Sequence, residues 1–285
     1  MHGRVLLPSL FLILLPVAVV PLPVGPARGS ADASVRRVAV PVTAAAWLVV
    51  VGWAVTVQIT EDPFREEPES ITAAGIVDER QFYIQRTGHK HPLLAEDYLD
   101  YPRMRAMVKT IADTPNGGLL LAAPAFTYWD VVPPPLPLSD EGPEHTVYFL
   151  NLGMTSMNAP LDVRVIDQMG LAYPLAAHTE RLEDGRIGHD KILPSEWVVA
   201  EAGAYPRRPV LPGYLDEDLV RQAQVALQCP ETKDRFASFE APWSFDRFKH
   251  NLRQAFTFNS YRIQREPEYE IQRCGLEMPP PVNPR

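Results

Sequence analysis

Residues 38–59 read VAVPVTAAAWLVVVGWAVTVQI, a run without a single charge. A helix rises about 1.5 Å per residue and the hydrocarbon core of a bilayer is about 30 Å thick, so roughly 20 apolar residues are enough to cross it. Residues 5–24, VLLPSLFLILLPVAVVPLPV, are uncharged over a similar length. The four prolines of this run are tolerated in a span, where neighbouring groups satisfy the freed carbonyls. We therefore predict a membrane region, residues 1–60, with two transmembrane helices at about 5–24 and 38–59.

The charges beside the two runs predict their orientation. The intervening loop, residues 25–37, carries three arginines and one aspartate, whereas residues 61–67 contain four carboxylates. Cationic loops are retained in the cytoplasm. We expect a multi-pass protein of the cell (inner or plasma) membrane, with loop 25–37 cytoplasmic and the C-terminal domain extracytoplasmic. The alternative is a secretory signal peptide that ends at the Ala-Asp-Ala of residues 31–33.

The composition excludes some classes of protein. The 285 residues include 27 Lys and Arg against 35 Asp and Glu, and 46% are hydrophobic. An acidic chain without a Lys/Arg-rich run does not favour nucleic acid as a partner. Proline, at 30 residues, is about twice as frequent as usual and predicts many loops. We assign residues 61–276 to the extracytoplasmic domain and residues 277–285 to a proline-rich tail.

Local patterns in the C-terminal domain alternate between helix and strand. Apolar residues at helical spacing after a proline, or acidic residues at a helix start, predict helices; β-branched and aromatic runs predict strands. The predicted helices are 101–112 and 215–227, the strands are 119–123, 145–150, 162–167 and 196–200, and a hairpin covers 260–265 and 269–273. The prediction is an α+β fold, with two N-terminal transmembrane helices followed by an extracytoplasmic mixed α/β domain.

Cys229 and Cys274 are the only two cysteines. A pair in an outward-facing domain favours a disulfide, which would stabilise the domain by about 3–4 kcal/mol because it closes a long loop. Two unrelated buried thiols are the alternative. Neither cysteine has a Cys or His at ligand spacing, so we predict no metal site in this chain. The sequence also contains no zinc signature, phosphate-binding loop or nucleophile elbow.

Polar side chains concentrate between residues 162 and 191. Strand alternation puts Asp162 and Arg164 on one face and Asp167 on the other, at the carboxyl end of the strand, where ligands often bind. The following loops offer His, Asp and Lys side chains that are able to bind sugar hydroxyls or phosphate. The candidate sugar-binding residues are Asp162, Arg164, Asp167, His178, Arg181, His189, Asp190 and Lys191. The alternative is an internal network of ion pairs and caps that holds the loops.

Three tryptophans of this domain, Trp129, Trp197 and Trp243, have rings that can stack on sugars. Tryptophan is more often a core residue, because it buries a large apolar area. We therefore expect all three in the core.

Several motifs, in order along the chain, resemble one family. They are MHGRVLLP (1–8), GIVDERQFY (75–83), DYLDYPRM (97–104), NLGMTSMN (151–158), LDVRVIDQ (161–168), PLAAHTERL (174–182), RIGHDK (186–191) and YEIQRCGL (269–276). Together they are similar to the C-terminal region of the actinobacterial terminal β-(1→2)-arabinofuranosyltransferases, over nearly the whole chain.

The resemblance implies a polytopic membrane glycosyltransferase of the GT-C type. Such an enzyme takes arabinofuranose from decaprenyl-phosphoryl-arabinose and caps the arabinan acceptor of arabinogalactan and lipoarabinomannan. Family members have a long front part with more spans and an acidic motif, which this chain lacks. The resemblance therefore assigns no catalytic residue to this chain and implies that it needs the missing N-terminal part for activity. Cofactors stay unknown, with a divalent metal conceivable in the complete enzyme.

The resemblance also suggests a donor contact at the start of the chain. The family's first matching span begins on the outer side of the membrane, so we expect His2 and Arg4 to contact the lipid phosphate, which a guanidinium binds through two hydrogen bonds. The alternative is that Arg4 reaches lipid headgroups without a specific partner. For the whole chain, the alternative functions are a non-catalytic, membrane-anchored binding or assembly module of the envelope, and a secreted hydrolase.

Overall fold

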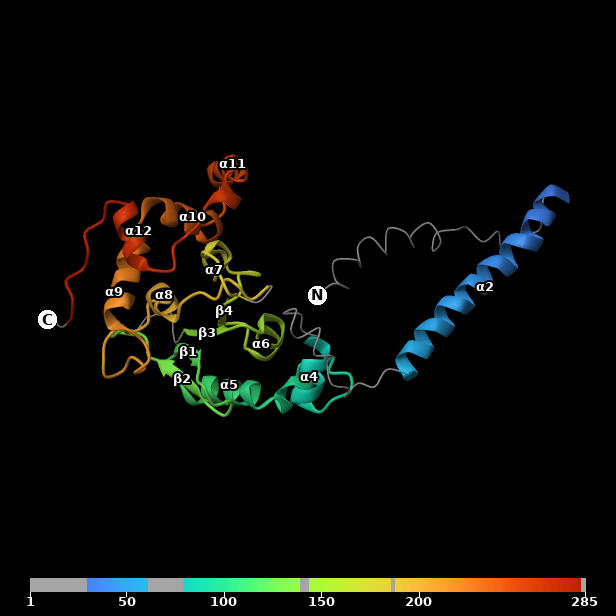
Figure 1. Cartoon of the computed structure of the whole chain (residues 1–285), viewed down its shortest axis with the longest axis horizontal. Coiled ribbons are helices and arrows are strands. Elements are labelled where there is room, and N and C mark those ends of the chain that lie inside the picture. The colour runs from blue at the N-terminus through green and yellow to red at the C-terminus, as the bar shows by residue number, and fades with distance from the viewer. Residues whose placement is uncertain (1–29, 61–78, 139–143, 186–187, 283–285) are drawn as a thin grey trace. The chain divides into compact units, whose positions relative to one another are not determined.

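The computed structural model describes residues 30–60, 79–138, 144–185 and 188–282 (Figure 1). The chain divides into two compact units, residues 1–85 with 89–91, and residues 86–88 with 92–285. The described part of the first unit contains α2 (Ser30–Thr60) and most of α4 (Glu79–Thr87). The second unit contains the sheet and the remaining helices.

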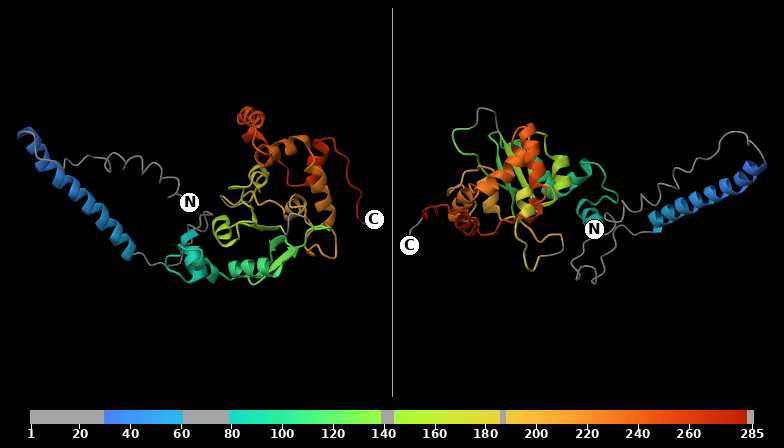
Figure 2. Two further views of the ribbon diagram at one scale, coloured as in Figure 1. Left: turned by 180° about the vertical axis from the view of Figure 1, so that it is seen from behind. Right: turned by 90° about the horizontal axis from the view of Figure 1, so that it is seen from above.

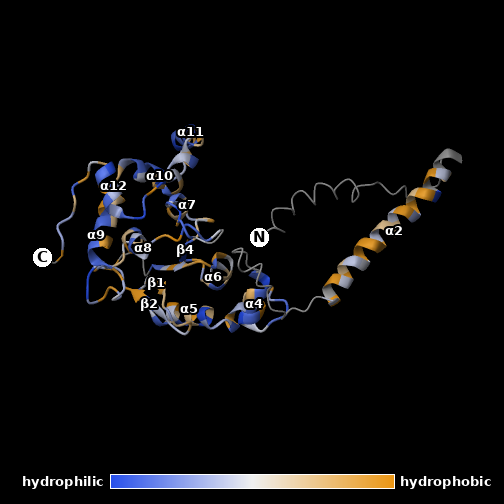
Figure 3. Cartoon of the chain, in the orientation of Figure 1, coloured by the Kyte–Doolittle hydropathy of each residue, from blue (hydrophilic) through white to orange (hydrophobic). Residues whose placement is uncertain are grey.

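Helix α2 includes the second predicted span. Its segment Ala33–Val57 is long and apolar enough to cross a bilayer, and none of it is buried within the protein. Figure 3 shows apolar residues, in orange, along most of its length. Helix α2 begins at Ser30, so its first residues belong to the predicted connection 25–37, whose cytoplasmic location stays a prediction. The described residues contain this one candidate span and not two; the span predicted at 5–24 lies outside them, as do His2 and Arg4.

The second unit is built on a mixed sheet of β1 (Gly118–Ala122), β2 (Trp129–Val132), β3 (His145–Phe149) and β4 (Arg164–Asp167). The strand order is β2-β1-β3-β4, in which β1 and β2 are antiparallel while β3 is parallel to both β1 and β4. In the register, Leu120 lies opposite both Val131 and Val147. β1 and β3 are almost entirely buried, as expected for central strands of a covered sheet. The α+β class is confirmed.

The remaining elements of this unit are helical. They are η1 (Glu96–Asp100), α5 (Pro102–Asp113), α6 (Leu152–Asn158), α7 (Pro174–His178), α8 (Ser195–Glu201), α9 (Glu217–Ala226), α10 (Pro230–Glu240), α11 (Phe245–Gln254), η2 (Phe258–Ser260) and α12 (Pro267–Arg273). Figure 2 shows the same unit from behind and from above, with the helices of the last third of the chain grouped together in orange and red.

Helices α8, α9 and α12 build the main core with the sheet. In α9 the buried residues Val220, Ala223 and Ala226 recur every three positions, which gives the helix one apolar face. Asp216 caps this helix by accepting the backbone N–H groups of Asp218 and Leu219. The tail returns along the same helix, because Val282 N–H donates to Asp218 Oδ1 at 2.8 Å.

Helix α5 was predicted at 101–112 and is observed one residue further on, with Pro102 at its first position. It also buries a charged residue, Arg103. The Arg103 guanidinium lies 4.6 Å from the ring centroid of Phe126 and 5.4 Å from that of Phe149, and it donates to the Ala123 carbonyl at 2.9 Å. Aromatic faces attract a cation, so the two rings partly compensate the Arg103 guanidinium for the hydration that it loses on burial.

Two predicted elements are wrong. Residues 196–200 form α8 and not a strand; three successive residues, Trp197 to Val199, are buried, so this short helix is enclosed on most sides. The predicted hairpin is also absent, because Pro267 begins α12 and the residues before it form only one bridge, between Thr179 and Ile263. Trp129 and Trp197 are core residues as predicted, whereas Trp243 is 77% exposed.

Candidate functional site

Asp167 was predicted to bind a ligand at the end of β4, but its side chain is completely buried. Its carboxylate accepts the backbone N–H groups of Met169 at 2.8 Å, of Ala172 at 2.9 Å and of Leu171. These three bonds fix the turn that follows the strand. The geometry therefore gives Asp167 a capping role, as in the alternative interpretation of this region.

His178, at the end of α7, is also buried. Its Nδ1 lies 3.0 Å from the carbonyl oxygen of Tyr261, and its ring meets those of Phe258 and Tyr261 edge to face. Burial lowers the pKa of His178, and the positive charge of Arg262 adds to this effect against the opposing hydrogen bond. A neutral imidazole then donates from Nδ1 to the carbonyl. His178 thus joins α7 to the segment around η2.

The loop after α7 brings three of the predicted residues near one another. Arg181 Nε lies 3.4 Å from Asp190 Oδ2, and Lys191 Nζ donates to the Ala177 carbonyl at 2.7 Å. These contacts tie the two ends of the loop together. Within the same predicted set, Asp162 is exposed in the turn before β4, and His189 is partly exposed.

Arg164 pairs with none of these described loop residues and belongs to a different group of side chains. It projects from β4 and binds both carboxylate oxygens of Glu201, at the end of α8, through Nη1 at 3.0 Å and through Nη2. Glu240, the last residue of α10, has Oε1 3.8 Å from Arg164 Nη2. The Arg164 guanidinium also lies 5.9 Å from the ring centroid of Tyr173. One arginine thus joins two carboxylates from two helices.

These carboxylates line an open cavity of about 540 Å³ between the ends of α8 and α9 and the side of α10. Its wall is apolar at Leu227 and Phe236 and polar at Gln228, Lys233, Glu201 and Glu240. Binding sites for small molecules commonly combine an apolar wall with a few converging polar groups. This cavity is the candidate site of the domain.

The two carboxylates differ in environment. The Glu201 side chain is almost buried and is paired with Arg164, whereas the Glu240 side chain is about half exposed. Partial burial raises the pKa of Glu240, and the neighbouring charge of Glu201 raises it further, against the opposing effect of Arg164. Glu240 is therefore the acidic group best placed to exchange hydrogen bonds with a ligand.

The arrangement can bind hydroxyl groups. Carboxylates accept hydrogen bonds from hydroxyls, Lys233 and Gln228 can donate to ring or hydroxyl oxygens, and Phe236 offers an apolar surface. The pair does not fit a divalent cation, because Arg164 already bonds both oxygens of Glu201. Among the described residues, no group of three or more His, Cys, Asp or Glu side chains is arranged to hold a metal ion.

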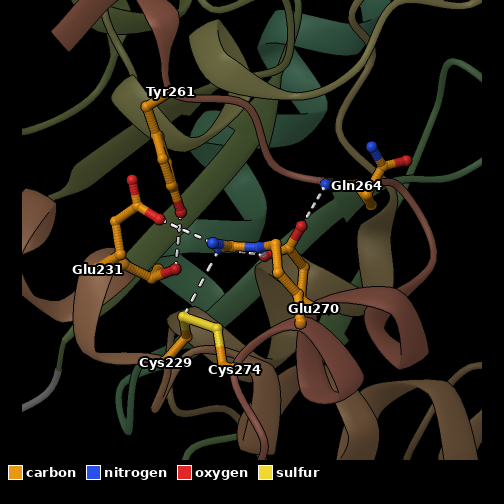
Figure 4. The surroundings of a disulfide bond; sticks show 8 residues. Cys229, Glu231, Tyr261, Gln264, Glu270 and Cys274 are labelled. Atoms are coloured by element: carbon orange, nitrogen blue, oxygen red, sulfur yellow. Dashed lines mark hydrogen bonds and ion pairs between the residues drawn. A yellow bond between two sulfur atoms is a disulfide. The ribbon is translucent and has the colours of Figure 1, made fainter. Parts of the chain in front are cut away.

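A disulfide supports the wall of this cavity. Cys229, directly before α10, is joined to Cys274, directly after α12, in agreement with the predicted pair. Figure 4 shows the acidic residues around this bond. Arg273 contacts Glu270 and Glu231, each at 2.7 Å, so it bridges α12 and α10 beside the disulfide. The covalent bond and the ion pairs together hold α10 at one end.

Sequence reasoning found Arg164 but missed its partners. Glu201 directly follows residues 196–200, which were predicted as a strand, and Glu240 lies in a helix that was not predicted. Pro194 was the available signal, because a helix that begins directly after it, at Ser195, ends at Glu201. No comparable local signal connects Glu240 with Arg164, because only the packing of α10 brings them together.

Comparison with known proteins identifies the class. The AftB family C-terminal domain matches residues 124–272, just over half of the chain. The matched range includes the sheet from β2 onward, the candidate cavity and most of α12. The chain therefore belongs to the AftB family, and the resemblance inferred from its motifs is confirmed.

Two curated proteins are similar over most of this chain. The terminal beta-(1->2)-arabinofuranosyltransferase of Mycobacterium tuberculosis is 45% identical over 98% of this chain and 46% of its own length. The protein of the same name from Corynebacterium glutamicum is 38% identical over 90% of this chain and 37% of its own length. The chain thus spans less than half the length of these relatives. No solved structure matches it.

Proposed function

We propose that this chain is the C-terminal part of an arabinofuranosyltransferase that uses a polyprenyl-phosphate-arabinose donor, decaprenyl-phosphoryl-arabinose, to cap the arabinan of arabinogalactan and lipoarabinomannan. The observation that supports this most is the 45% identity to the mycobacterial arabinofuranosyltransferase across 98% of the chain. Because the chain spans less than half of that protein, we assign the catalytic carboxylates to the other part and expect this chain to be inactive alone.

In this proposal the C-terminal domain binds the arabinan acceptor. Arabinan presents hydroxyl groups and no charge, so its natural partners are carboxylate, amide and ammonium groups beside an apolar wall. The cavity around Glu240, Lys233 and Phe236 offers this combination. Among the residues predicted from sequence, Arg164 contributes by holding Glu201 at the cavity. Binding here would orient the acceptor, and orientation alone can lower a reaction barrier substantially.

Acceptor binding can be tested with an arabinan oligosaccharide and the detergent-solubilised chain. Glu240→Gln keeps an oxygen that accepts a hydrogen bond but removes its charge, and a hydrogen bond to a charged group is worth about 1 kcal/mol more than a neutral one, so we expect binding to weaken about fivefold. Glu183→Gln, an equal charge change at an exposed loop residue, is the control. Equal affinities of the wild type and Glu240→Gln would contradict this assignment.

The transferase activity needs a separate test. The chain would be co-expressed with the N-terminal half of the mycobacterial relative, and transfer of labelled arabinose from its lipid donor would be measured. We expect transfer only with both parts present. If the pair transfers nothing while the full-length mycobacterial protein is active in parallel, the proposal loses its support.

The second candidate, a membrane-anchored envelope module without catalysis, is favoured by the pairing of both cavity carboxylates with Arg164.

The membrane placement belongs to the same proposal. We infer that α2 crosses the cell membrane and leaves the C-terminal domain on the extracytoplasmic side, where the acceptor is found. A phosphatase fused to the C-terminus should be active, and a fluorophore that matures only in the cytosol should be dark.

For the donor, we retain His2 and Arg4 as contacts to the lipid phosphate. Arg4→Ala in the complete enzyme should weaken donor binding, and unchanged affinity would refute this role.

A further inference from the structure

Helix α11 turns its polar side toward the protein. Arg247 and Asn251 both donate to the carbonyl oxygen of Ser238 in α10, each with a bond of 2.7 Å. One turn further on, His250 Nε2 lies 2.8 Å from the carboxylate of Asp234. His250 and Asn251 follow Arg247 by three and four positions, so all three lie on one side of the helix. The helix is therefore attached to α10 by hydrogen bonds, and none of its residues is buried.

The opposite side of α11 is apolar and faces solvent. Phe245, Phe248 and Leu252 recur at spacings of three and four residues and are 60%, 50% and 57% exposed. The apolar surface continues into Trp243, which is 77% exposed, and Phe256, which is 88% exposed. In Figure 1, α11 lies at the outer edge of the domain, beyond α10. An exposed apolar patch of this kind marks a binding surface.

Basic side chains border this surface. Lys249 and Arg253 are exposed and follow the apolar residues along the same helix. The exposed carboxylate of Asp246 lies 3.6 Å from Lys249 Nζ and offsets one charge, and Arg247 and Arg253 leave the helix with a net positive charge. The Lys249 ammonium lies 4.4 Å from the ring centroid of Phe245, so charge and aromatic ring occupy one site. The whole chain has a net charge of −8, which makes a basic helix a local feature of this region. Aromatic residues beside lysine and arginine are typical of helices that lie in a membrane interface.

We propose that α11 docks onto the surface of an anionic phospholipid bilayer, with Trp243, Phe245, Phe248 and Leu252 inserted at the headgroup level. Two observations favour a bilayer over a protein partner. The bordering positive charges complement anionic headgroups, and the apolar face is rich in the aromatic residues that prefer the interface. In addition, α2 tethers the domain to a bilayer, so a weak surface helix would act at a high effective concentration. The inference rests on α2 as a membrane anchor and not on the transferase activity.

The test uses the full chain, reconstituted into vesicles of phosphatidylcholine and phosphatidylglycerol. A fluorophore is attached to Leu252→Cys, and in a matched control to Asp113→Cys, an exposed site at the end of α5 in the same unit. The disulfide leaves no free cysteine in the described residues, so each label has one site. Quenching is measured with a lipid that carries a spin label near its headgroup and, separately, with iodide in the water.

We expect the lipid quencher to act several-fold more strongly on residue 252 than on residue 113, because an interfacial helix buries its apolar face by about 5–10 Å. Iodide should act mainly on residue 113. Lys249→Gln and Arg253→Gln should each reduce the ratio of docked to free helix about fivefold, as expected for one basic residue near an anionic surface.

Three results would overturn the proposal. Iodide quenching at residue 252 equal to that at residue 113 would show that the face stays in water. Protection of residue 252 from both quenchers would show that protein covers it, whether a second copy or another part of a longer chain. Equal lipid quenching in pure phosphatidylcholine would contradict the requirement for anionic lipid.

Phe245→Ser combined with Phe248→Ser should abolish the lipid quenching while the disulfide and the unfolding transition are retained.

Discussion

Helices α9 and α11 have the same length and both are amphipathic, yet they use their apolar sides in opposite ways. α9 buries Val220, Ala223 and Ala226 in the main core, where α8 and α12 pack against it. α11 buries no residue and bonds its polar side to α10. The difference lies in the neighbours, because α10 offers a free carbonyl and a carboxylate where α9 meets apolar side chains. Periodicity therefore identifies the two faces of a helix but not which one the protein covers.

The largest expected effect separates the two helices directly. Val220→Asp would place a carboxylate in the core of α9, and we expect a loss of at least about 4 kcal/mol or failure to fold. Phe248→Asp makes the same chemical change on the exposed face of α11 and should change the free energy of unfolding by no more than about 0.5 kcal/mol. Denaturant unfolding in detergent, followed by tryptophan fluorescence, measures both. Equal losses would show that α11 belongs to the core.

The next effect concerns the bond between the two regions. The disulfide joins the start of α10 to the end of α12, which packs on α9. It closes a loop across a sequence separation of 45 residues, so Cys229→Ala with Cys274→Ala should lower the free energy of unfolding by roughly 3–4 kcal/mol. The oxidised and reduced wild-type chains provide a control without substitution. If the double variant unfolds at the wild-type denaturant concentration, the bond does not constrain α10.

A smaller effect distinguishes local from global stability. Asp216 caps α9 and Ser244 caps α11, where it accepts the backbone N–H of Arg247 at 3.1 Å. Replacing either cap by alanine should cost about 1 kcal/mol. Asp216→Ala should lower the global stability, whereas Ser244→Ala should only increase hydrogen exchange within residues 245–254. Mass spectrometry of exchanged peptides tests this, and a global change in Ser244→Ala would refute it.

The smallest effect is a pH dependence at His178, whose ring packs on Phe258 just after α11. Its pKa is lowered in the folded protein, mainly by burial. The unfolded chain therefore binds a proton first, near pH 6.5, and stability is lost as the pH falls below that value toward the folded pKa. His178→Gln retains a donor for the Tyr261 carbonyl and should flatten this part of the stability profile. An unchanged slope would show that another group causes it.

The elements that were predicted from sequence are those whose pattern is complete within the element. Helix α5 was predicted from Pro102 and the helical spacing of Met104, Met107 and Ile111. Helix α9 was predicted from the acidic residues at the start of α9. Residues 196–200 have the composition of a strand. They form a helix that other elements enclose on most sides, and a helix enclosed in this way also has an almost continuous apolar run. At residue 267, a proline between two glutamates suits the first turn of a helix as well as it suits a turn, and the helix was the correct interpretation.

The candidate site was predictable only in part for a similar reason. Arg164 was found because a strand places it beside other polar residues. Its partner Glu201 is 37 residues away in sequence and Glu240 is further still, so packing alone joins them. Asp167 and His178 carry the chemistry of a binding site, but burial and backbone hydrogen bonds use them for structure. Residue type indicated the region, and only the contacts distinguish a ligand-facing group from an internal one.

The sheet has consequences for many copies of this domain at high local concentration. Both outer strands of the described sheet, β2 and β4, are only four residues long. Pro133, which lacks an N–H, follows β2, and the paired Arg164 begins β4. A strand from a neighbouring copy would find few backbone groups to pair with at either edge. Crowding of many copies should therefore not extend the sheet from one molecule into the next.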